Sequence, residues 1–170
     1  MSFRKLTEQA NQKNNSKWPY TLAMENKSFN LQLVLDANEV HKQAEWWARA
    51  LGWVVEYPEE SFLKKLESAG LLKEDDLVEF EGRRVFRTGS AIHQMNADGS
   101  RGVRIYIRGV RAPKAERNRI HWDIEAKPQS IDEVVERLKE MGAKQIGEHF
   151  QGPNRSVQML DPENNEFCVH

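Results

Sequence analysis

Polar side chains that could transfer protons or bind a metal occupy alternate positions of the predicted strands near the end of the chain. His121 and Asp123 stand two residues apart in the stretch 120–124, and Cys168 lies within the final stretch 166–170. Because successive side chains of a strand point to opposite faces of its sheet, His121 and Asp123 share one face. Imidazole and carboxylate serve in acid–base catalysis, and imidazole and thiolate bind transition metals. The spacing therefore indicates a chemically active sheet face.

The first half of the chain carries a comparable set of polar side chains. Gln32 and Asp36 alternate with leucines in the stretch 31–36, and Arg104 and Arg108 alternate with apolar residues in 102–110. If the two halves pair, we expect these side chains to meet His121, Asp123 and Cys168 on a concave face. Two adjacent carboxylates would raise one pKa and give an acid–base pair. The alternative is that Asp36 and Asp123 are cap or loop residues, or ion-pair partners of Arg119.

A strand followed by a helix that ends at Leu-Gly or Met-Gly occurs twice. Strand 29–36 precedes a helix from Asn38 to Leu51, with Gly52 as the stop, and strand 120–124 precedes the helix 130–143. Asn38 is the expected N-cap of the first helix, and Ser130 with Glu133 forms a predicted capping box. Further strands follow each helix, so we predict an α+β fold of paired βαβββ modules that form a cupped mixed sheet with helices on the outer face.

The remaining predictions concern boundaries. Residues 1–27 are polar and form an arm, which could be an interaction segment or a passive extension, and 28–170 form one domain with modules at about 28–111 and 118–170. The helix 59–72 is interpreted as an insertion that could act as a lid or simply pack. The other predicted strands are 53–57, 77–80, 85–95, 102–110, 144–149 and 156–160, with a turn at Asp98-Gly99.

Composition excludes several classes of protein. The formal net charge of −1 gives no electrostatic reason to bind nucleic acid or an anionic membrane. One cysteine cannot form an internal disulfide, and neither a signal peptide nor an apolar run of membrane-spanning length is visible. We therefore expect a cytoplasmic protein.

Three motifs together resemble the vicinal oxygen chelate superfamily, which includes glyoxalases and bleomycin-resistance proteins. They are Leu-Asp-Ala at 35–37 with Trp-Trp-Ala-Arg-Ala-Leu-Gly at 46–52, Asn-Arg-Ile-His-Trp-Asp at 118–123, and Asp-Pro-Glu-Asn-Asn-Glu-Phe-Cys at 161–168. The resemblance covers residues 29–57 and 101–170. It implies paired modules that curl around a cup, often in a homodimer.

The resemblance also implies a divalent ion held by one side chain from each of four strands. Carried over by motif position, the ligands are Gln32, His121 and Cys168, and the strand 102–110 offers no carboxylate. A guanidinium such as that of Arg104 cannot bind a metal. Three mixed ligands would suit zinc, whereas the missing carboxylate favours a cup without metal.

Two functions follow from this resemblance. The first is a glyoxalase-like protein, a lyase, isomerase or hydrolase, that binds a small organic molecule in the cup. Its expected catalytic residues are His121, Asp123 and Asp36, and its expected substrate-binding residues are Trp53, Arg104, Tyr106 and Cys168. The second is a non-catalytic binding protein of the bleomycin-resistance type, which holds a compound between two subunits. A protein-interaction module that uses the arm 1–27 is a third hypothesis.

Overall fold

The computed structural model describes residues 31–170, of which Gln32–His170 form one compact unit. The arm predicted at 1–27 and the beginning of the strand predicted at 29–36 lie outside the described residues. Two βαβββ modules follow one another in the described part of the chain, and an insertion interrupts the first of them.

The first module forms a four-stranded mixed sheet with one helix. Its elements are β1 (Leu33–Ala37), α2 (Val40–Leu51), β2 (Val54–Val55), β5 (Gly89–Met95) and β6 (Arg101–Gly109). The strand order is β1-β6-β5-β2, in which β1 and β6 are parallel and the other pairs are antiparallel.

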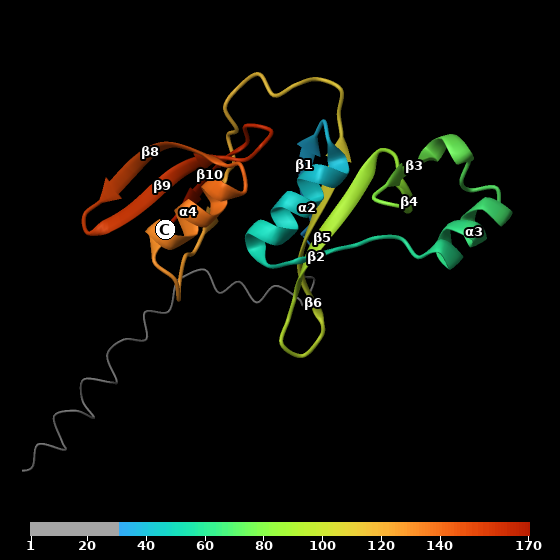
Figure 1. The fold of residues 1–170 in the computed structure, drawn as a ribbon, viewed down its shortest axis with the longest axis horizontal. Coiled ribbons are helices and arrows are strands. Elements are labelled where there is room, and N and C mark those ends of the chain that lie inside the picture. The colour runs from blue at the N-terminus through green and yellow to red at the C-terminus, as the bar shows by residue number, and fades with distance from the viewer. Residues whose placement is uncertain (1–30) are drawn as a thin grey trace, which may run out of the picture. The chain divides into compact units, whose positions relative to one another are not determined.

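The second module repeats this topology. Its elements are β7 (Trp122–Ile124), α4 (Ile131–Glu140), β8 (Lys144–Gln151), β9 (Asn154–Leu160) and β10 (Glu166–Val169), and the strand order is β7-β10-β9-β8. Again the first and last strands are parallel and the other pairs antiparallel. Figure 1 shows α2 beside the first sheet and α4 beside the second. The predicted α+β class and paired modules are confirmed, and the strands form two separate four-stranded sheets.

The insertion between β2 and β5 is larger than predicted. It contains α3 (Glu60–Ser68), a 3-10 turn η1 (Glu74–Asp76) and the hairpin of β3 (Leu77–Phe80) and β4 (Arg83–Phe86). Leu63, Leu72 and Leu77 give it a small core of its own. In Figure 1 it lies on the side of the first sheet away from the second module.

The prediction of one strand over 85–95 was wrong, because the chain turns at Arg87 and Thr88 between β4 and β5. The Arg87 guanidinium donates hydrogen bonds of 2.7 Å to the carbonyl oxygens of Asp75 and Leu77, and these bonds hold the turn against η1. The other differences are at element ends: β2 is shorter than 53–57, α3 ends before 72, and β7 begins after His121.

Helix α2 ends as predicted but begins differently. Gly52 adopts the left-handed conformation, with φ 68°, and the Trp53 amide donates to the Ala48 carbonyl at 2.8 Å. Asn38 is not the N-cap, because its side-chain amide donates instead to the carbonyls of Val110 and Ala112. The carboxylate of Glu163 accepts from the amides of Asn38 and Glu39, both at 2.7 Å, so the second module caps this helix.

A buried carboxylate joins the two modules. Asp161, which is fully buried, belongs to the turn between β9 and β10. It accepts hydrogen bonds from the side chains of Gln43 and Trp47 on α2, the latter at 3.0 Å. It also accepts from the backbone amides of Glu163 and Asn165 and from the Asn165 side chain. Burial raises the pKa of the Asp161 carboxyl, and the surrounding donors oppose that rise.

Aromatic side chains complete the contact between the modules. The Trp47 ring meets Trp122 with its centroid 4.5 Å away and Phe167 at 5.2 Å, both from the second module. The neighbouring Trp46, 3% exposed, donates its indole N–H to the Met141 carbonyl at 2.8 Å. Helix α2 therefore buries two sides, one against its own sheet and one against the second module. Trp46 therefore lies at the contact between the two modules.

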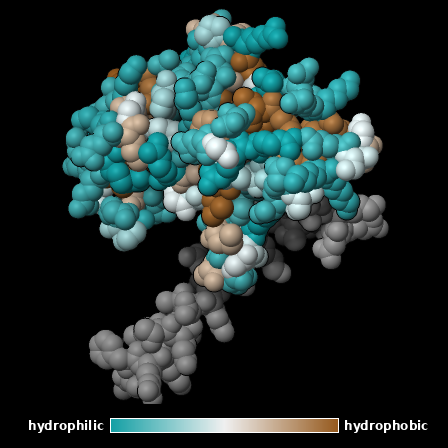
Figure 2. Space-filling view, turned by 45° about the vertical axis from the view of Figure 1, so that its right-hand side comes forward, coloured by the Kyte–Doolittle hydropathy of each residue, from teal (hydrophilic) through white to brown (hydrophobic). Residues whose placement is uncertain are grey.

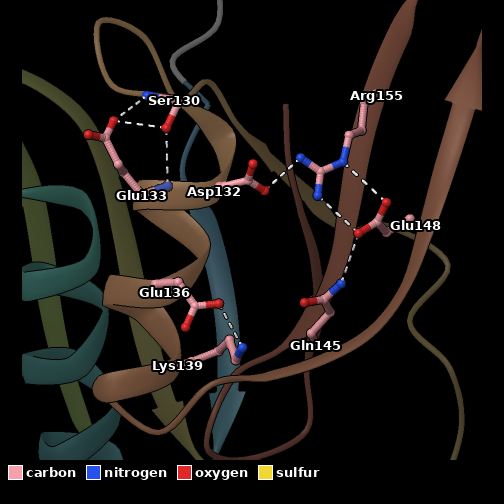
Figure 3. A network of polar contacts seen from close by, with 8 residues as sticks. All are labelled: Ser130, Asp132, Glu133, Glu136, Lys139, Gln145, Glu148 and Arg155. Atoms are coloured by element: carbon pink, nitrogen blue, oxygen red, sulfur yellow. Dashed lines mark hydrogen bonds and ion pairs between the residues drawn. The ribbon is translucent and has the colours of Figure 1, made fainter.

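Helix α4 is held on the second sheet by a polar network (Figure 3). The predicted capping box is confirmed: the Ser130 hydroxyl accepts from the Glu133 amide, and the Glu133 carboxylate accepts from the Ser130 amide at 2.8 Å. Arg155 on β9 pairs with Asp132 on α4 at 2.7 Å and with Glu148 on β8 at 2.9 Å. Because these groups reach the surface, the network orients the helix more than it stabilises the fold.

The strands separate an apolar helix face from a polar outer face. Ile105 and Ile107 of β6 are buried in the main core. Arg108, the next residue of the same strand, is exposed to solvent. The surface seen in Figure 2 is mostly hydrophilic, with apolar side chains gathered in limited areas. Of the helices in residues 31–170, none has the length and apolar character needed to cross a membrane.

His41 anchors the insertion to α2. Its ring lies 5.1 Å from that of Phe80, and its Nε2 lies 3.0 Å from the Phe86 carbonyl oxygen. The side chain is 9% exposed, and burial lowers the pKa of the imidazole from its ordinary value of 6.5. The contact is consequently built around a neutral imidazole that donates from Nε2.

Replacing Asp161 with Asn should lower the free energy of unfolding by about 3 kcal/mol, because an amide nitrogen would face donors that are buried and left unpaired. Urea denaturation followed by circular dichroism measures this change. Asp75→Asn, an exposed position on η1, is the matched control and should behave as wild type. Equal denaturation midpoints for the two variants would contradict the role given to Asp161.

Stability should fall as the pH drops below about 6.5, and part of that fall should come from His41. The sign follows from the lowered pKa: the unfolded chain takes up a proton at a higher pH than the folded one does. His41→Gln removes the titrating group and keeps a donor. The difference in unfolding free energy between wild type and this variant, measured in urea at pH 7.5 and 5.5, should change with pH. A constant difference would contradict the prediction.

Candidate functional site

Three predicted site residues meet on the outer face of the second sheet. Cys168 on β10 is the register partner of Asp123 on the parallel strand β7, and His121 precedes β7. One ligand atom of each lies within 4.8 Å of the others. The His121 Nε2 is 3.5 Å from the Asp123 Oδ1. The imidazole and carboxylate are exposed and the thiol is half-buried, so the cluster is open to a ligand.

The cysteine of this cluster is a poor nucleophile as it stands. Burial raises the pKa of the Cys168 thiol, and the charge of Asp123, together with a hydrogen bond to it, raises the pKa further. Since thiolate is the reactive and metal-binding form, Cys168 stays protonated at neutral pH unless a cation replaces the proton. His121 and Asp123 are the members suited to proton transfer.

Gln32, the metal ligand predicted on the first module, is not free to join this cluster. The Gln32 side-chain oxygen accepts a hydrogen bond from the Arg104 guanidinium. Arg104 also binds both carboxylate oxygens of Glu56, at 2.9 to 3.1 Å. Burial opposes the ionisation of Glu56, but Arg104 nevertheless holds the pKa of that carboxyl below its ordinary value. Gln32, expected as a metal ligand, and Arg104, expected to bind substrate, are therefore joined in one ion-paired group.

Two further residues belong to that group, and one of them, Glu56, was missed at the level of sequence. Glu56 follows β2, and His93 lies on β5 opposite Arg104. The His93 Nδ1 is 3.0 Å from the Glu56 Oε1 but is not aligned for a hydrogen bond, and the ring is buried. Glu56 was placed in a predicted strand, yet only its register against β5 reveals that it faces Arg104.

Asp36 is paired with an arginine and not with Asp123. The Arg108 guanidinium donates to both carboxylate oxygens of Asp36, at 2.8 and 2.9 Å, and both side chains are exposed. Tyr106 lies between Arg104 and Arg108 along the same face of β6. Its ring covers Gly89, where any side chain would collide with the phenol. Asp36 is thus ion-paired, but with Arg108 and not with Arg119, the partner that the alternative named.

A groove of about 860 Å³ connects the two modules on this side. Asp36, Arg108 and His121 line it together, as do Lys114 and Glu166, whose side chains pair at 2.9 Å. Asn118 orients Glu166 by donating its backbone amide at 3.0 Å. The groove brings polar groups from both modules within reach of one small molecule.

Trp53 does not line this groove. It was expected to wall the cup beside Tyr106, but it lines a second cavity together with Trp122 and residues on the helix face of the sheets. Its half-buried ring packs against the main core. Of the predicted substrate-binding set, Arg104, Tyr106 and Cys168 face outward, and Trp53 does not join them.

The sequence profile of the glyoxalase-like domain matches residues 32–170, and the chain belongs to this family. A direct sequence comparison with curated proteins found no match. The predicted resemblance to the vicinal oxygen chelate superfamily is confirmed.

Solved structures share the fold at low sequence identity. The fosfomycin resistance protein FosX from Listeria monocytogenes is 18% identical with a TM-score of 0.54, and the match covers 85% of this chain and 91% of that chain. FosX from Mesorhizobium loti is 14% identical with a TM-score of 0.53, over 85% and 91% of the two chains. A variant of the Listeria protein, in complex with Mn(II) and 1S,2S-dihydroxypropylphosphonic acid, is 17% identical with a TM-score of 0.54, over 85% and 90%.

Replacing Asp123 with Asn should make Cys168 more reactive, because it removes a negative charge that raises the thiol pKa. A fall of half a pKa unit would increase the thiolate fraction about threefold at a pH below the pKa. The rate of alkylation by iodoacetamide at pH 8 measures this directly, since the chain has one cysteine. Asp75→Asn is the control, and an unchanged or slower rate for Asp123→Asn would contradict the assignment.

Proposed function

We propose that this protein is a cytosolic glyoxalase-like protein that binds a small polar organic molecule in the groove between its modules and acts on it through His121. The observation that carries the proposal is the convergence of His121, Asp123 and Cys168 on one open sheet face. The groove supplies charged and amide groups from both modules, which suits a ligand with oxygen atoms along its length.

His121 is the acid–base residue in this proposal. Asp123, 3.5 Å away, stabilises the protonated imidazole and holds the ring beside the groove. Arg108 would contact an anionic group of the ligand, for which it would share its guanidinium with Asp36. The reaction would be a proton-transfer reaction of the lyase or isomerase type.

The cluster also fits a metal ion, with a different set of ligands from the one expected. His121, Asp123 and Cys168 offer an imidazole nitrogen, a carboxylate oxygen and a sulfur, the mixed set that suits zinc. Gln32 is engaged by Arg104 and does not add a fourth ligand. A bound ion would supply Lewis-acid activation of a ligand oxygen, while the chain's own residues bind and orient the ligand.

The non-catalytic binding protein is the alternative, and one observation favours it. In the first module, Arg104, Glu56 and Gln32 form a group that is bonded internally, so that module adds no open ligand or base to the cluster. Val34 is 52% exposed and Ile120 is 81% exposed, and both line the groove. We propose that a second copy of the chain in a homodimer covers these apolar side chains.

Metal analysis shows whether the cluster works as a metal-dependent site or without a metal ion. Tag-free protein is loaded in turn with zinc, nickel, iron and manganese, dialysed, and measured by inductively coupled plasma mass spectrometry. Bound metal near one equivalent that falls at least tenfold in His121→Ala supports the metal-dependent enzyme. His149→Ala, which removes an exposed histidine from β8, is the matched control and should retain the metal.

A failure to bind any metal ion is equally informative. If no ion binds under any loading, metal-dependent chemistry at this cluster is excluded. A thermal-shift screen of small carboxylates and phosphonates then tests ligand binding at the groove, with Arg108→Gln expected to abolish the shift. Absence of any ligand-induced shift that depends on Arg108 or His121 would overturn the proposed function itself.

A further inference from the structure

A second cavity lies on the helix side of the sheets, where the edge strands β1 and β7 approach each other. Its volume is about 790 Å³. Five large apolar side chains that pack against the main core line it and remain partly exposed, namely Leu33, Leu51, Trp53, Trp122 and Ile124. Apolar surface left in water is unfavourable, so this part of the core is incompletely covered by the residues that the structure describes.

This cavity adjoins the groove that contains His121, because Leu33 and Trp122 line both, but Arg108 and His121 line the groove alone. Strand alternation places Leu33 on the opposite face of β1 from Asp36, and Trp122 on the opposite face of β7 from Asp123. The cavity reaches Asp123 along the edge of β7, but its apolar floor belongs to the helix face. A ligand held there would contact the ends of both helices and not the imidazole.

Two arginines at this cavity have no acidic partner in the part of the chain that the structure describes. Arg49 lies in the last turn of α2, and Arg137 lies on α4. The Arg137 Nη2 donates to the Ala50 carbonyl oxygen at 3.1 Å, and its Nη1 approaches only the Met141 sulfur at 3.8 Å. The nearby Lys127 pairs with Glu125 at 3.4 Å, whereas neither arginine forms an ion pair within residues 31–170.

An ordinary structural role explains only part of this arrangement. A cation in the last turn stabilises a helix, and the bond from Arg137 to Ala50 helps to end α2. Neither role uses the remaining N–H groups of the two guanidiniums, nor does it account for two indole rings facing an open cavity. An apolar floor with two unpaired cations matches an amphiphilic anion.

We propose that this cavity is a second binding site, for a small carboxylate with an aromatic or branched hydrocarbon body. The hydrocarbon lies against Trp53 and Trp122, and the carboxylate accepts hydrogen bonds from Arg137 and is attracted by Arg49. The volume is in the range of 300–1,000 Å³ that is usual for small-molecule sites. The site does not depend on the chemistry of His121.

The test compares two probes that differ in charge alone. Isothermal titration of the full chain with 4-phenylbutanoate and with 4-phenylbutanamide, at equal ionic strength, gives both affinities. The carboxylate is expected to bind at least about tenfold more tightly, which is the effect of one lost charge-assisted contact. Equal affinities for the acid and the amide, or no heat with either at millimolar concentration, would overturn the proposal.

Variants locate the binding. Arg49→Gln should weaken the carboxylate about tenfold and leave the amide unchanged, and Trp53→Ala should weaken both. Arg137→Gln should resemble Arg49→Gln, but Arg49 is the decisive position because Arg137 also bonds to the Ala50 carbonyl. Arg111→Gln, at an exposed linker position, is the matched control and should bind like wild type. Carboxylate binding that survives both Arg49→Gln and Trp53→Ala would place the anion elsewhere and contradict the inference.

Discussion

The buried carboxylate of Asp161 is the constraint on which the rest of the structure depends. Two oxygens in the turn before β10 accept from two side chains of α2 and from the turn's own amides, so one group both shapes the turn and fastens it to the other module. Glu163, two residues later, caps the same helix. Without this attachment the strands β7 and β10, and with them His121 and Cys168, would have no defined position relative to β1.

The two modules share a topology but differ in what their outer faces can do. In the second module, histidine, aspartate and cysteine are partly free to meet a ligand. In the corresponding part of the first module, Arg104 satisfies both Glu56 and Gln32, and the group is closed. The two modules share a topology, but the side chains that could do chemistry are concentrated on the second module.

Much of the fold could be predicted because it is encoded locally. The Ser130 capping box, the Gly52 helix end and the alternation that pairs His121 with Asp123 depend on residues a few positions apart. What could not be predicted depends on partners far away in the chain. Asn38 looked like a helix cap, but its amide is used by carbonyls more than 70 residues on. Likewise, Trp53 was expected in the cup, yet it packs against the core and lines the cavity on the helix side of the sheet.

The position of α2 has a consequence for the two halves of such a doubled chain. Trp122, Met141 and Phe167 of the other module help to cover Trp46 and Trp47. A half-length chain with the same helix would expose part of both indoles to water, and association with another copy of itself would cover them again. The covalent link at residues 110–121 makes the contact between the two halves intramolecular. The helix faces of the halves are therefore tied to each other, whereas their solvent faces can differ.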